Sequence, residues 1–374
     1  MIDIISNFLR ERIDAGDFPS AVYLVAEKGE IVMQDALGLA VVEPERIEAQ
    51  IDTIYDLASL TKPLVTGLLV ARSIEDGDLA IGAEIRDFVP EAERLDLRIT
   101  VRQLATHVSG MPAWIPLYVL APSRARVIET ICDIMSMAKA SERVEYSDLG
   151  YILLSRSLTD RLDAEFEWKA IEGLDLADTF FIGFEQSNAV KNLQRRRIAA
   201  SENGSRYERS ICVAKGYIAE TVKHHAFREH LIWGEVHDGN AYFMGGVAGH
   251  AGLFSTAEDV FKIAQQFLPN YSQLLRPETC ELFRTNFTPG MNEDRSFAFQ
   301  LASTKDSTAG TKMSPESFGH LGFTGTSLWI DPIKERVFIL LTNRTHNRSL
   351  PFVNINSVRR RFHDLAIDIL DRNS

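Results

Sequence analysis

Strand-like segments stand at both ends of this chain, and that arrangement limits the folds that the sequence can adopt. Near the N-terminus, residues 21–26 and 31–37 are strand-like segments on either side of a tight turn at Lys28-Gly29, as in a hairpin. Near the C-terminus, residues 327–330 and 337–341 form a second strand pair around a turn. The sequence between them is mainly helical in pattern. A sheet assembled from the two ends and flanked by helices would bury all four strands.

We therefore predict an α+β fold, an α/β sandwich with an antiparallel sheet, in a single domain over residues 1–374. The α/β part is expected at about 1–84 and 248–374, with a mainly helical insertion at about 85–247. The 374 residues are enough for a sizeable buried core. The polar stretch 185–240 is interpreted as an excursion over the surface that could serve as an interface or a lid.

The overall composition limits the classes of molecule that this chain is expected to bind and the compartment in which it is expected to work. The formal net charge is −12 and the pI about 5.3, which disfavours nucleic acid and anionic membrane surfaces. Cys132, Cys212 and Cys280 are far apart and form no C-x-x-C pair, so we expect buried free thiols in a reducing compartment. The chain begins with an amphipathic helix pattern, without a secretory signal pattern, and no apolar run could span a bilayer. A cytoplasmic location is therefore predicted.

Ser59-Leu60-Thr61-Lys62 places a hydroxyl and an amine one helical turn apart, where a strand-like segment gives way to a helix. Positions i and i+3 lie on the same helix face, so Lys62 can contact Ser59. A serine hydroxyl is a weak nucleophile until a neighbouring base takes its proton, and a desolvated lysine can help. The pattern indicates an acyl-transfer enzyme with a covalent serine ester. The same spacing recurs at Ser136 and Lys139, and either pair alone also fits an ordinary helix surface.

Two further motifs follow in sequence order. The first is Tyr-Ser-Asp at residues 146–148. A tyrosine near a lysine can have a lowered pKa and act as a general base, although the segment alone also fits a capped helix start. The second is His-Leu-Gly-Phe-Thr-Gly-Thr at residues 320–326. A glycine-rich strand edge lets the backbone approach a substrate closely, and a main-chain N–H there can face an oxyanion.

Together and in this order, the three motifs resemble those of the serine β-lactamase and penicillin-binding-protein superfamily. The chain looks most like the class C β-lactamase-like branch, which also holds esterases, D-stereospecific aminopeptidases and DD-peptidases. That branch uses Ser-x-x-Lys, then Tyr-x-Asn, then Lys/His-x-Gly. The segments 99–112 and 247–256 resemble it too, so the likeness covers nearly the whole chain. The separation from Tyr146 also favours Ser59 over Ser136.

The resemblance implies a role for each matching position. Ser59 would be the nucleophile, and Lys62 would keep Tyr146 or Ser59 basic. Tyr146 would move the proton from Ser59 to the leaving group. The N–H groups of Ser59 and Phe323 would form the oxyanion hole. No metal or organic cofactor is implied, and the expected partner is a small-molecule ester, an amide or a short peptide.

The implied substrate-binding positions are Asp148, His320 and Gly322, and two of them depart from the family pattern. Asp148 stands where many members have Asn. A carboxylate near Lys62 would favour the charged ammonium, as a partner of a tyrosinate, and would repel a substrate carboxylate nearby. His320 takes a place often held by Lys, which weakens the positive site that β-lactam and peptidoglycan carboxylates need. Both departures favour neutral esters or amides and weak β-lactam turnover.

We therefore predict a serine hydrolase with esterase-like or peptidase-like activity. One rival is a DD-carboxypeptidase or β-lactamase, which would need a longer N-terminus because peptidoglycan lies outside the cytoplasm. The other rival is a catalytically idle binding or scaffold protein of the same fold. Such a protein would have no chemical need for Ser59, Lys62 and Tyr146 together. Assembly into a homo-oligomer stays open.

Several histidines invite a metal or dyad interpretation. His224, His225 and His230 lack the i, i+4 pairing and the placed acid of a helical metal site, so they are interpreted as part of a solvated stretch. His237 and Asp238 could form a dyad and are interpreted as a loop clamp at the pocket mouth. The candidate pocket walls, which could equally be core residues, are Trp114, Tyr118 and Trp233.

Overall fold

The computed structural model describes residues 2–94, 98–135, 142–158, 171–183, 195–219 and 226–373. Its larger sheet has seven strands in the order β3-β2-β1-β10-β9-β8-β7, and every neighbouring pair is antiparallel. The strands are β1 (Ser20–Glu27), β2 (Glu30–Val41), β3 (Ile47–Glu48), β7 (Gln300–Leu301), β8 (Phe318–Leu321), β9 (Ser327–Asp331) and β10 (Arg336–Thr342). Strands β1 and β10 pair along the middle, with Ala21 opposite Thr342. The predicted sheet built from both ends of the chain is confirmed.

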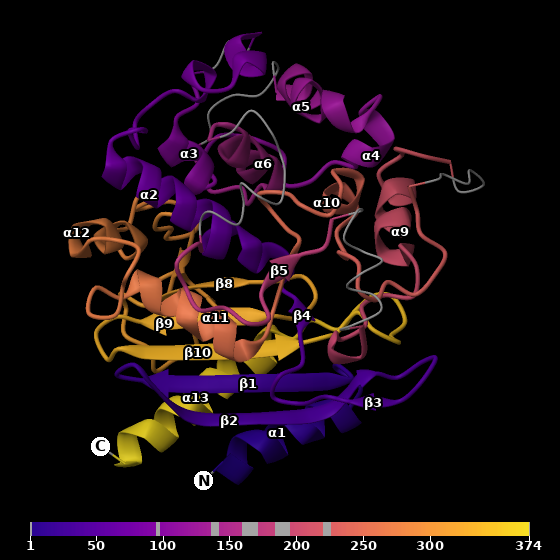
Figure 1. The fold of residues 1–374 in the computed structure, drawn as a ribbon, viewed down its shortest axis with the longest axis vertical. Coiled ribbons are helices and arrows are strands. Elements are labelled where there is room, and N and C mark those ends of the chain that lie inside the picture. Colours follow the sequence, from indigo (N-terminus) through magenta and orange to yellow (C-terminus); the bar gives the residue numbers. More distant parts are fainter. Residues whose placement is uncertain are drawn as a thin grey trace.

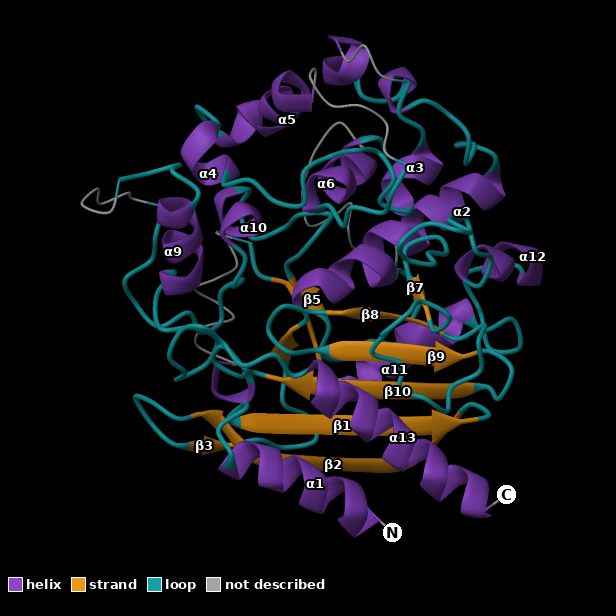
Figure 2. Ribbon diagram, turned by 180° about the vertical axis from the view of Figure 1, so that it is seen from behind, coloured by secondary structure: helices purple, strands orange, loops and turns teal. Residues whose placement is uncertain are grey.

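The central strand β1 is buried on both faces because helices cover both sides of the sheet. Val22, Leu24 and Ala26 belong to one core, while Ala21, Tyr23 and Val25 belong to the other, as strand alternation requires. Helices α1 (Ile2–Asp14) and α13 (Asn356–Asn373) cover the second face (Figure 2). Helix α11 (Ala257–Ala264) lies over the first face (Figure 1). The result is the predicted sandwich of helices and sheet.

The middle of the chain supplies a group of short helices beyond one edge of the sheet, in the upper part of Figure 1. They are η3 (Ile85–Asp87), η4 (Pro90–Arg94), α3 (Val101–Ala105), α4 (Leu117–Leu120), η5 (Arg124–Arg126), α5 (Val127–Met135), α6 (Asp148–Arg156), α9 (Arg206–Ala214) and α10 (Gly239–Phe243). The short η6 (Arg195–Arg197) lies apart from them, where Arg196 pairs with Glu45 at 2.7 Å. Three further pieces follow α11, namely η7 (Gln265–Phe267), α12 (Pro277–Cys280) and η8 (Glu281–Phe283). The exact limits of the helical insertion stay a prediction.

A second, three-stranded sheet ties these helices to the α/β part. Its order is β4 (Tyr55–Asp56), β6 (Leu253–Ser255) and β5 (Phe180–Phe181). Strand β5 comes from the stretch that was expected to be helical. Strand β4 leads directly into the first sequence motif, so this small sheet fixes the position of Ser59 relative to the helices.

Side-chain capping contacts mark the starts of two helices. Thr100 forms a full capping box with Gln103 at the start of α3. The Thr256 hydroxyl accepts the Asp259 N–H at 3.3 Å and caps α11. As expected, the three cysteines are buried and form no disulfide.

The interpretation of residues 185–240 as a surface excursion is wrong for the part that the structure describes. Glu202, Trp233 and His237 are buried there. The reason is a set of internal polar contacts: Arg228 donates to the His237 carbonyl at 2.6 Å, and His237 Nε2 lies 3.1 Å from Glu202. The side chains of Arg228, His237 and Glu202 therefore find partners inside the protein instead of in water.

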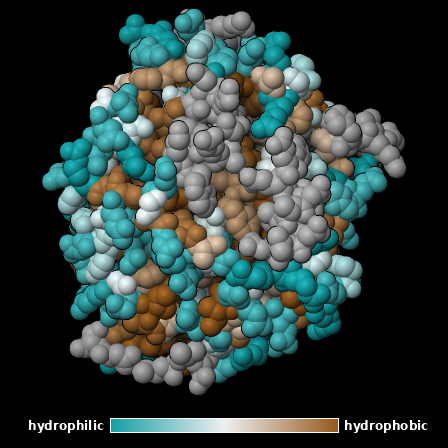
Figure 3. All heavy atoms as spheres, in the orientation of Figure 1, coloured by the Kyte–Doolittle hydropathy of each residue, from teal (hydrophilic) through white to brown (hydrophobic). Residues whose placement is uncertain are grey.

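Hydrophilic residues cover much of the described surface in the orientation of Figure 3, with small apolar areas between them. Within the described ranges, no helix has both the length and the apolar character that crossing a membrane requires.

Candidate active site

The nucleophile candidate sits on a tight turn between a strand and a helix. Ser59 lies in η1 (Ala58–Leu60), and the π-helix η2 (Lys62–Gly67) and α2 (Leu68–Asp76) follow. The residue before Ser59, Ala58, has φ of 48°, in the left-handed region that non-glycine residues rarely adopt. Buried Asp56 accepts the N–H of Ala58 at 2.8 Å and the N–H of His237 at 2.7 Å. These bonds hold the strained turn that presents Ser59.

Lys62 is completely buried directly beneath the Ser59 hydroxyl. Its Nζ lies 3.0 Å from Ser59 Oγ, 3.1 Å from the His250 carbonyl oxygen and 2.7 Å from Asp148 Oδ1. Burial acts to lower the pKa of Lys62, but Asp148 and Tyr146 outweigh burial and raise that pKa above its ordinary value of 10.5. Lys62 is therefore an ammonium group at neutral pH.

Tyr146 lies beside this ammonium group. The centroid of its ring is 4.9 Å from Lys62 Nζ, and its hydroxyl oxygen is buried without a hydrogen bond of normal geometry. Burial raises the pKa of Tyr146 above 10.0, an effect that Lys62 opposes and Asp148 reinforces. The ring also packs on His107, with 4.5 Å between ring centroids. The sequence motif thus brings Ser59, Lys62 and Tyr146 together as predicted.

The third motif forms the opposite side of the site. Gly322 lies so close to the turn before Ser59 that a Cβ there would stand 2.5 Å from the Leu57 carbonyl oxygen, which excludes larger residues. The hydroxyls of Thr324 and Thr326 donate to the carbonyls of Asp56 and Leu57 at 2.7 and 3.0 Å. These contacts hold the loop that carries Phe323 next to Ser59.

His320 is buried in strand β8 and packs against Tyr146, with 5.7 Å between ring centroids. Burial and the charges of Lys62 and Arg295 hold the pKa of His320 well below its ordinary value of 6.5, so the ring is neutral. Its Nδ1 is 3.0 Å from the Leu321 carbonyl and donates to it, which leaves the buried Nε2 as an acceptor without a partner. His320 therefore packs beside Tyr146, and neither the Tyr146 hydroxyl nor His320 Nε2 has a hydrogen bond of normal geometry among the described residues.

Two cavities meet at Ser59. The first, about 330 Å³, includes Ser59, Tyr146, His320, Phe323 and three arginines, Arg295, Arg344 and Arg359. The second, about 410 Å³, includes Ser59, Tyr146, Asp148, Phe323 and the side chains Trp114, Tyr207, Glu208, Ile211, Lys215, His237 and Asp238. We call them the arginine cavity and the acidic cavity.

The candidate pocket walls divide between cavity and core. Trp114 lines the acidic cavity, as predicted. Tyr118 is buried behind it, with 6.5 Å between the two ring centroids. Trp233 is a core residue whose Nε1 donates to the Ile198 carbonyl at 2.8 Å, so it is no pocket wall. Ser136, Lys139, His224 and His225 lie outside the described residues.

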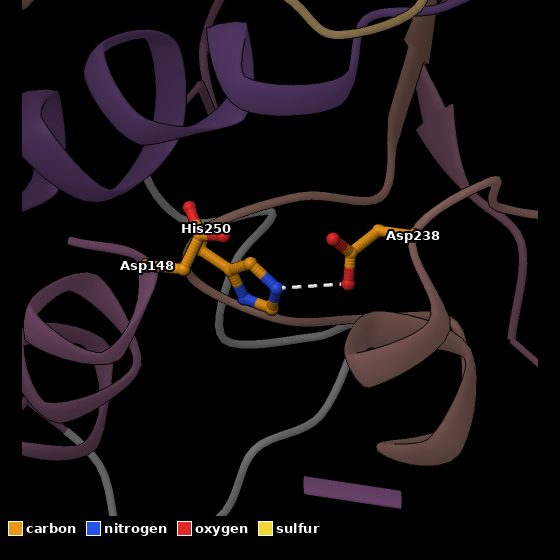
Figure 4. A group of neighbouring side chains, drawn as sticks. All are labelled: Asp148, Asp238 and His250. Carbon is orange, nitrogen blue, oxygen red and sulfur yellow. Dashed lines mark hydrogen bonds and ion pairs between the residues drawn. The ribbon is translucent and has the colours of Figure 1, made fainter. Parts of the chain in front are cut away.

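The dyad interpretation of His237 and Asp238 is replaced by a different pairing. Asp238 caps α10 and its Oδ1 lies 3.0 Å from His250 Nε2 (Figure 4). Burial acts to raise the pKa of Asp238, but His250 outweighs it and holds that pKa below the ordinary value of 3.8. His237 instead approaches Glu202.

Within the described residues, the side chains that could hold a metal ion are Asp148, Asp238 and His250, whose ligand atoms lie within 4.8 Å of one another (Figure 4). Lys62 Nζ, however, stands 2.7 Å from Asp148 and neutralises it, while His250 Nε2 already engages Asp238. The protein's own ammonium group therefore supplies the cation that these carboxylates need.

Sequence reasoning missed Asp56, Arg295 and Glu208. Asp56 precedes the Ser-x-x-Lys motif by three residues, and a buried acid next to a motif was the available signal. Arg295 and Glu208 lie in loops and short helices without a recognisable motif. Their place beside Ser59 follows only from the folded chain.

The β-lactamase family profile matches residues 5–358, and the chain belongs to that family. In sequence it is similar to an Escherichia coli (strain K12) protein named "Putative D-alanyl-D-alanine carboxypeptidase", with 28% identity over 376 residues that cover 91% of this chain and 82% of that protein.

Among solved structures, it resembles EstCE1, a hydrolase with promiscuous acyltransferase activity (TM-score 0.70, 17% identity, 96% and 97% of the two chains covered). It also resembles a class C β-lactamase from Rhodobacter sphaeroides (TM-score 0.67, 16% identity, 98% and 99% covered). These structures share its fold, and the resemblance derived from the three motifs is confirmed. The protein is a β-lactamase-family hydrolase.

Proposed function

We propose that this hydrolase forms a covalent acyl-enzyme on Ser59 and acts on esters or amides of small molecules or short peptides. The observation that carries the proposal is the fully buried Lys62 ammonium, which contacts Ser59 Oγ at 3.0 Å and Asp148 at 2.7 Å. A buried charge is costly unless it is paired or takes part in the chemistry. The Lys62 ammonium contacts Ser59, and Ser59 and Tyr146 are the two hydroxyl-bearing residues that line both cavities. The cytoplasmic location and homo-oligomer remain predictions.

In the proposed acylation, Ser59 Oγ bonds to the substrate carbonyl carbon while its proton passes to the phenolate form of Tyr146. The Lys62 ammonium favours that phenolate by its charge. The N–H groups of Ser59 and Phe323 receive the oxyanion. Tyr146 then gives the proton to the leaving group as the bond to the carbonyl carbon breaks. In deacylation, the water oxygen bonds to the acyl carbon while Tyr146 takes a proton from the water. Tyr146 then gives that proton to Ser59 Oγ as the ester bond breaks, which releases the acid and free Ser59.

Intact mass after exposure to a fluorophosphonate probe, with peptide mapping, tests this proposal. We expect one adduct, on Ser59, and its loss in Ser59→Ala. Ser136→Ala is the matched control, because that serine has the same spacing to a lysine, and it should label like the unmodified protein. An adduct on Ser136, or none on Ser59, would overturn the assignment and favour a binding or scaffold role.

The arginine cavity favours one narrower candidate, a DD-carboxypeptidase-like activity. Arg344 and Arg359 donate to main-chain carbonyls and, among the described residues, neither pairs with a carboxylate; Arg295 alone is paired, with Glu293 at 2.9 Å. Burial lowers the pKa of Arg359 to about 9, as expected for a guanidinium without an acidic partner. This cavity would suit a leaving group with a carboxylate, such as a C-terminal D-alanine, better than the neutral substrates predicted from Asp148 and His320.

Hydrolysis of a diacetyl-L-lysyl-D-alanyl-D-alanine peptide and of its C-terminal amide separates these possibilities. We expect kcat/KM to be higher for the free carboxylate, and the ratio to fall about tenfold or more in Arg344→Gln, which removes an arginine without an acidic partner among the described residues, because charge-assisted hydrogen bonds contribute about 1.5–3 kcal/mol. Arg284→Gln, at an exposed ion pair with Glu281, is the control for loss of one positive charge. Equal rates for acid and amide would reject the narrower candidate and leave the general hydrolase proposal intact.

A further inference from the structure

The acidic cavity carries three carboxylates, and only one of them has no cationic partner among the described residues. Asp148 pairs with Lys62 at 2.7 Å, and Asp238 pairs with His250 at 3.0 Å. Glu208, on α9, accepts the Gly239 N–H at 2.8 Å through Oε1. Its other oxygen, Oε2, is buried and has no hydrogen bond of normal geometry, although the neutral Tyr118 hydroxyl lies near enough to oppose part of the effect of burial on the pKa of Glu208.

Burying the carboxylate of Glu208 in this cavity wall costs electrostatic free energy. Its side chain is 7% exposed, in the wall of a cavity whose other walls include Trp114, Ile211 and Phe323. Burial, reinforced by the charge of Asp238, raises the pKa of Glu208 to about 7. A leucine or methionine would fill such a wall without that electrostatic cost. A buried carboxylate beside a substrate cavity, with neutral hydrogen-bonding neighbours such as the Gly239 N–H and the Tyr118 hydroxyl, therefore indicates a charged ligand group that completes it.

The same cavity is suited to a positively charged group in other ways. The rings of Trp114 and Tyr207 lie in its wall, and aromatic faces attract ammonium groups. The exposed Lys215 already places its Nζ 5.8 Å from the centroid of Trp114. Gly239 lets the Glu208 carboxylate approach the backbone of α10, since a Cβ there would stand 2.0 Å from Oε2.

We propose that the acidic cavity binds the acyl half of the substrate and selects acyl groups that carry a primary ammonium group, which Glu208 receives. The inference rests on the proposed acyl-enzyme function: Ser59 lines both cavities, and if the arginine cavity receives a leaving group with a carboxylate, the acidic cavity is left for the acyl half. The arginine cavity, on the other side of Ser59, then faces the leaving group. The substrate class is thus an amino-acyl ester or amide, such as a peptide with a free amino group on its acyl side.

Three pairs of p-nitroanilides test the proposal: D-alanyl with isobutyryl, 4-aminobutanoyl with pentanoyl, and 6-aminohexanoyl with heptanoyl. Within each pair a methyl group replaces the ammonium group, so size is matched and charge differs. We expect at least one amine to exceed its partner in kcat/KM about tenfold or more, the range of a charge-assisted hydrogen bond. In Glu208→Gln that ratio should fall to about threefold or less, since the amide can no longer pair with the charge.

Glu278→Gln is the matched control, because Glu278 is an exposed acid on α12 and its replacement makes the same change in net charge. It should keep the full amine preference. Fluorophosphonate labelling of Ser59 is measured on every variant alongside. Labelled protein that prefers no amine, or a preference that survives Glu208→Gln, overturns this inference alone. Loss of labelling from the unmodified protein overturns the acyl-enzyme proposal beneath it.

Discussion

Asp148→Asn removes the negative charge that keeps Lys62 an ammonium group inside the protein. Lys62 is fully buried, with Asp148 Oδ1 2.7 Å from its Nζ, and Asp148 is itself only 14% exposed. The amide has nearly the same shape and can still accept a hydrogen bond. The substitution therefore tests charge with little change in packing.

The expected loss of stability can be estimated from this geometry. Breaking a buried ion pair by removing one partner costs about 3–5 kcal/mol, and the partial exposure of Asp148 favours the lower figure. For 374 residues the unfolding entropy is about 0.8 kcal/mol/K, so a loss of about 3 kcal/mol lowers Tm by about 4 °C.

The pH dependence of that loss gives a sharper test because its sign is fixed. In the unmodified protein the pKa of Lys62 is raised above 10.5, so its contribution to stability is present below pH 10.5 and is lost only as pH rises through the folded-state pKa. Without Asp148, burial dominates and lowers the folded-state pKa of Lys62. The unfolded variant then binds more protons than the folded one, and the stability of the variant rises with pH up to about 10.5.

Calorimetric Tm values at pH 7, 8, 9 and 9.5, for both proteins, measure this difference. The deficit of Asp148→Asn should narrow as pH rises. Asp78→Asn, at an exposed position after α2, should show no such trend. A deficit that stays constant or widens with pH would refute the reasoning, because it would mean that Lys62 keeps its proton without Asp148.

Three further predictions follow from the same electrostatics and packing. Because the pKa values of Lys62 and Tyr146 are both raised, kcat/KM for a p-nitrophenyl ester, corrected for background hydrolysis, should still rise with pH above 8, and a plateau near pH 7 would contradict this. Gly239→Ala places a Cβ 2.0 Å from Glu208 Oε2 and should lower the free energy of unfolding in urea by about 1–3 kcal/mol. Burial lowers the pKa of His363 to about 3, so the unfolded chain takes up a proton at this histidine below pH 6.5 while the folded protein does not, and the free energy of unfolding decreases as pH falls. In His363→Gln, the slope of the free energy of unfolding against pH between 6 and 4 should be smaller by about 1.4 kcal/mol per pH unit.

The sheet and the motif residues could be predicted because their signals are local. The alternation along β1 fixes which residues face each core, and Thr100 and Thr256 mark helix starts by their own capping bonds. Ser59 and Lys62 meet because they are three residues apart on one helical turn. Tyr146 and His320 come from elsewhere in the chain, and their approach to this pair followed from the family resemblance.

The charged lining of the two cavities could not be predicted in this way. Arg295 reaches the site because its loop folds back, with its N–H donating to Thr288 Oγ1 at 2.8 Å and its carbonyl accepting the Phe287 N–H at 2.8 Å. Glu208 lies on an amphipathic helix in a polar stretch, where an acid normally faces water. Its burial depends on the approach of α10, which the sequence near Glu208 does not encode.

The prediction of neutral substrates weighed Asp148 and His320 one at a time, whereas the field at Ser59 depends on pairs. Asp148 is neutralised by Lys62, so its charge repels a substrate carboxylate much less than an isolated acid would. Arg344 and Glu208 have no opposite charge beside them among the described residues, and they lie in different cavities on either side of Ser59. Among buried side chains, where the effective dielectric constant is low, an unpaired charge acts over a longer range than a neutralised pair. The charges on the two halves of the substrate, more than its size, are therefore the properties that separate the candidate functions.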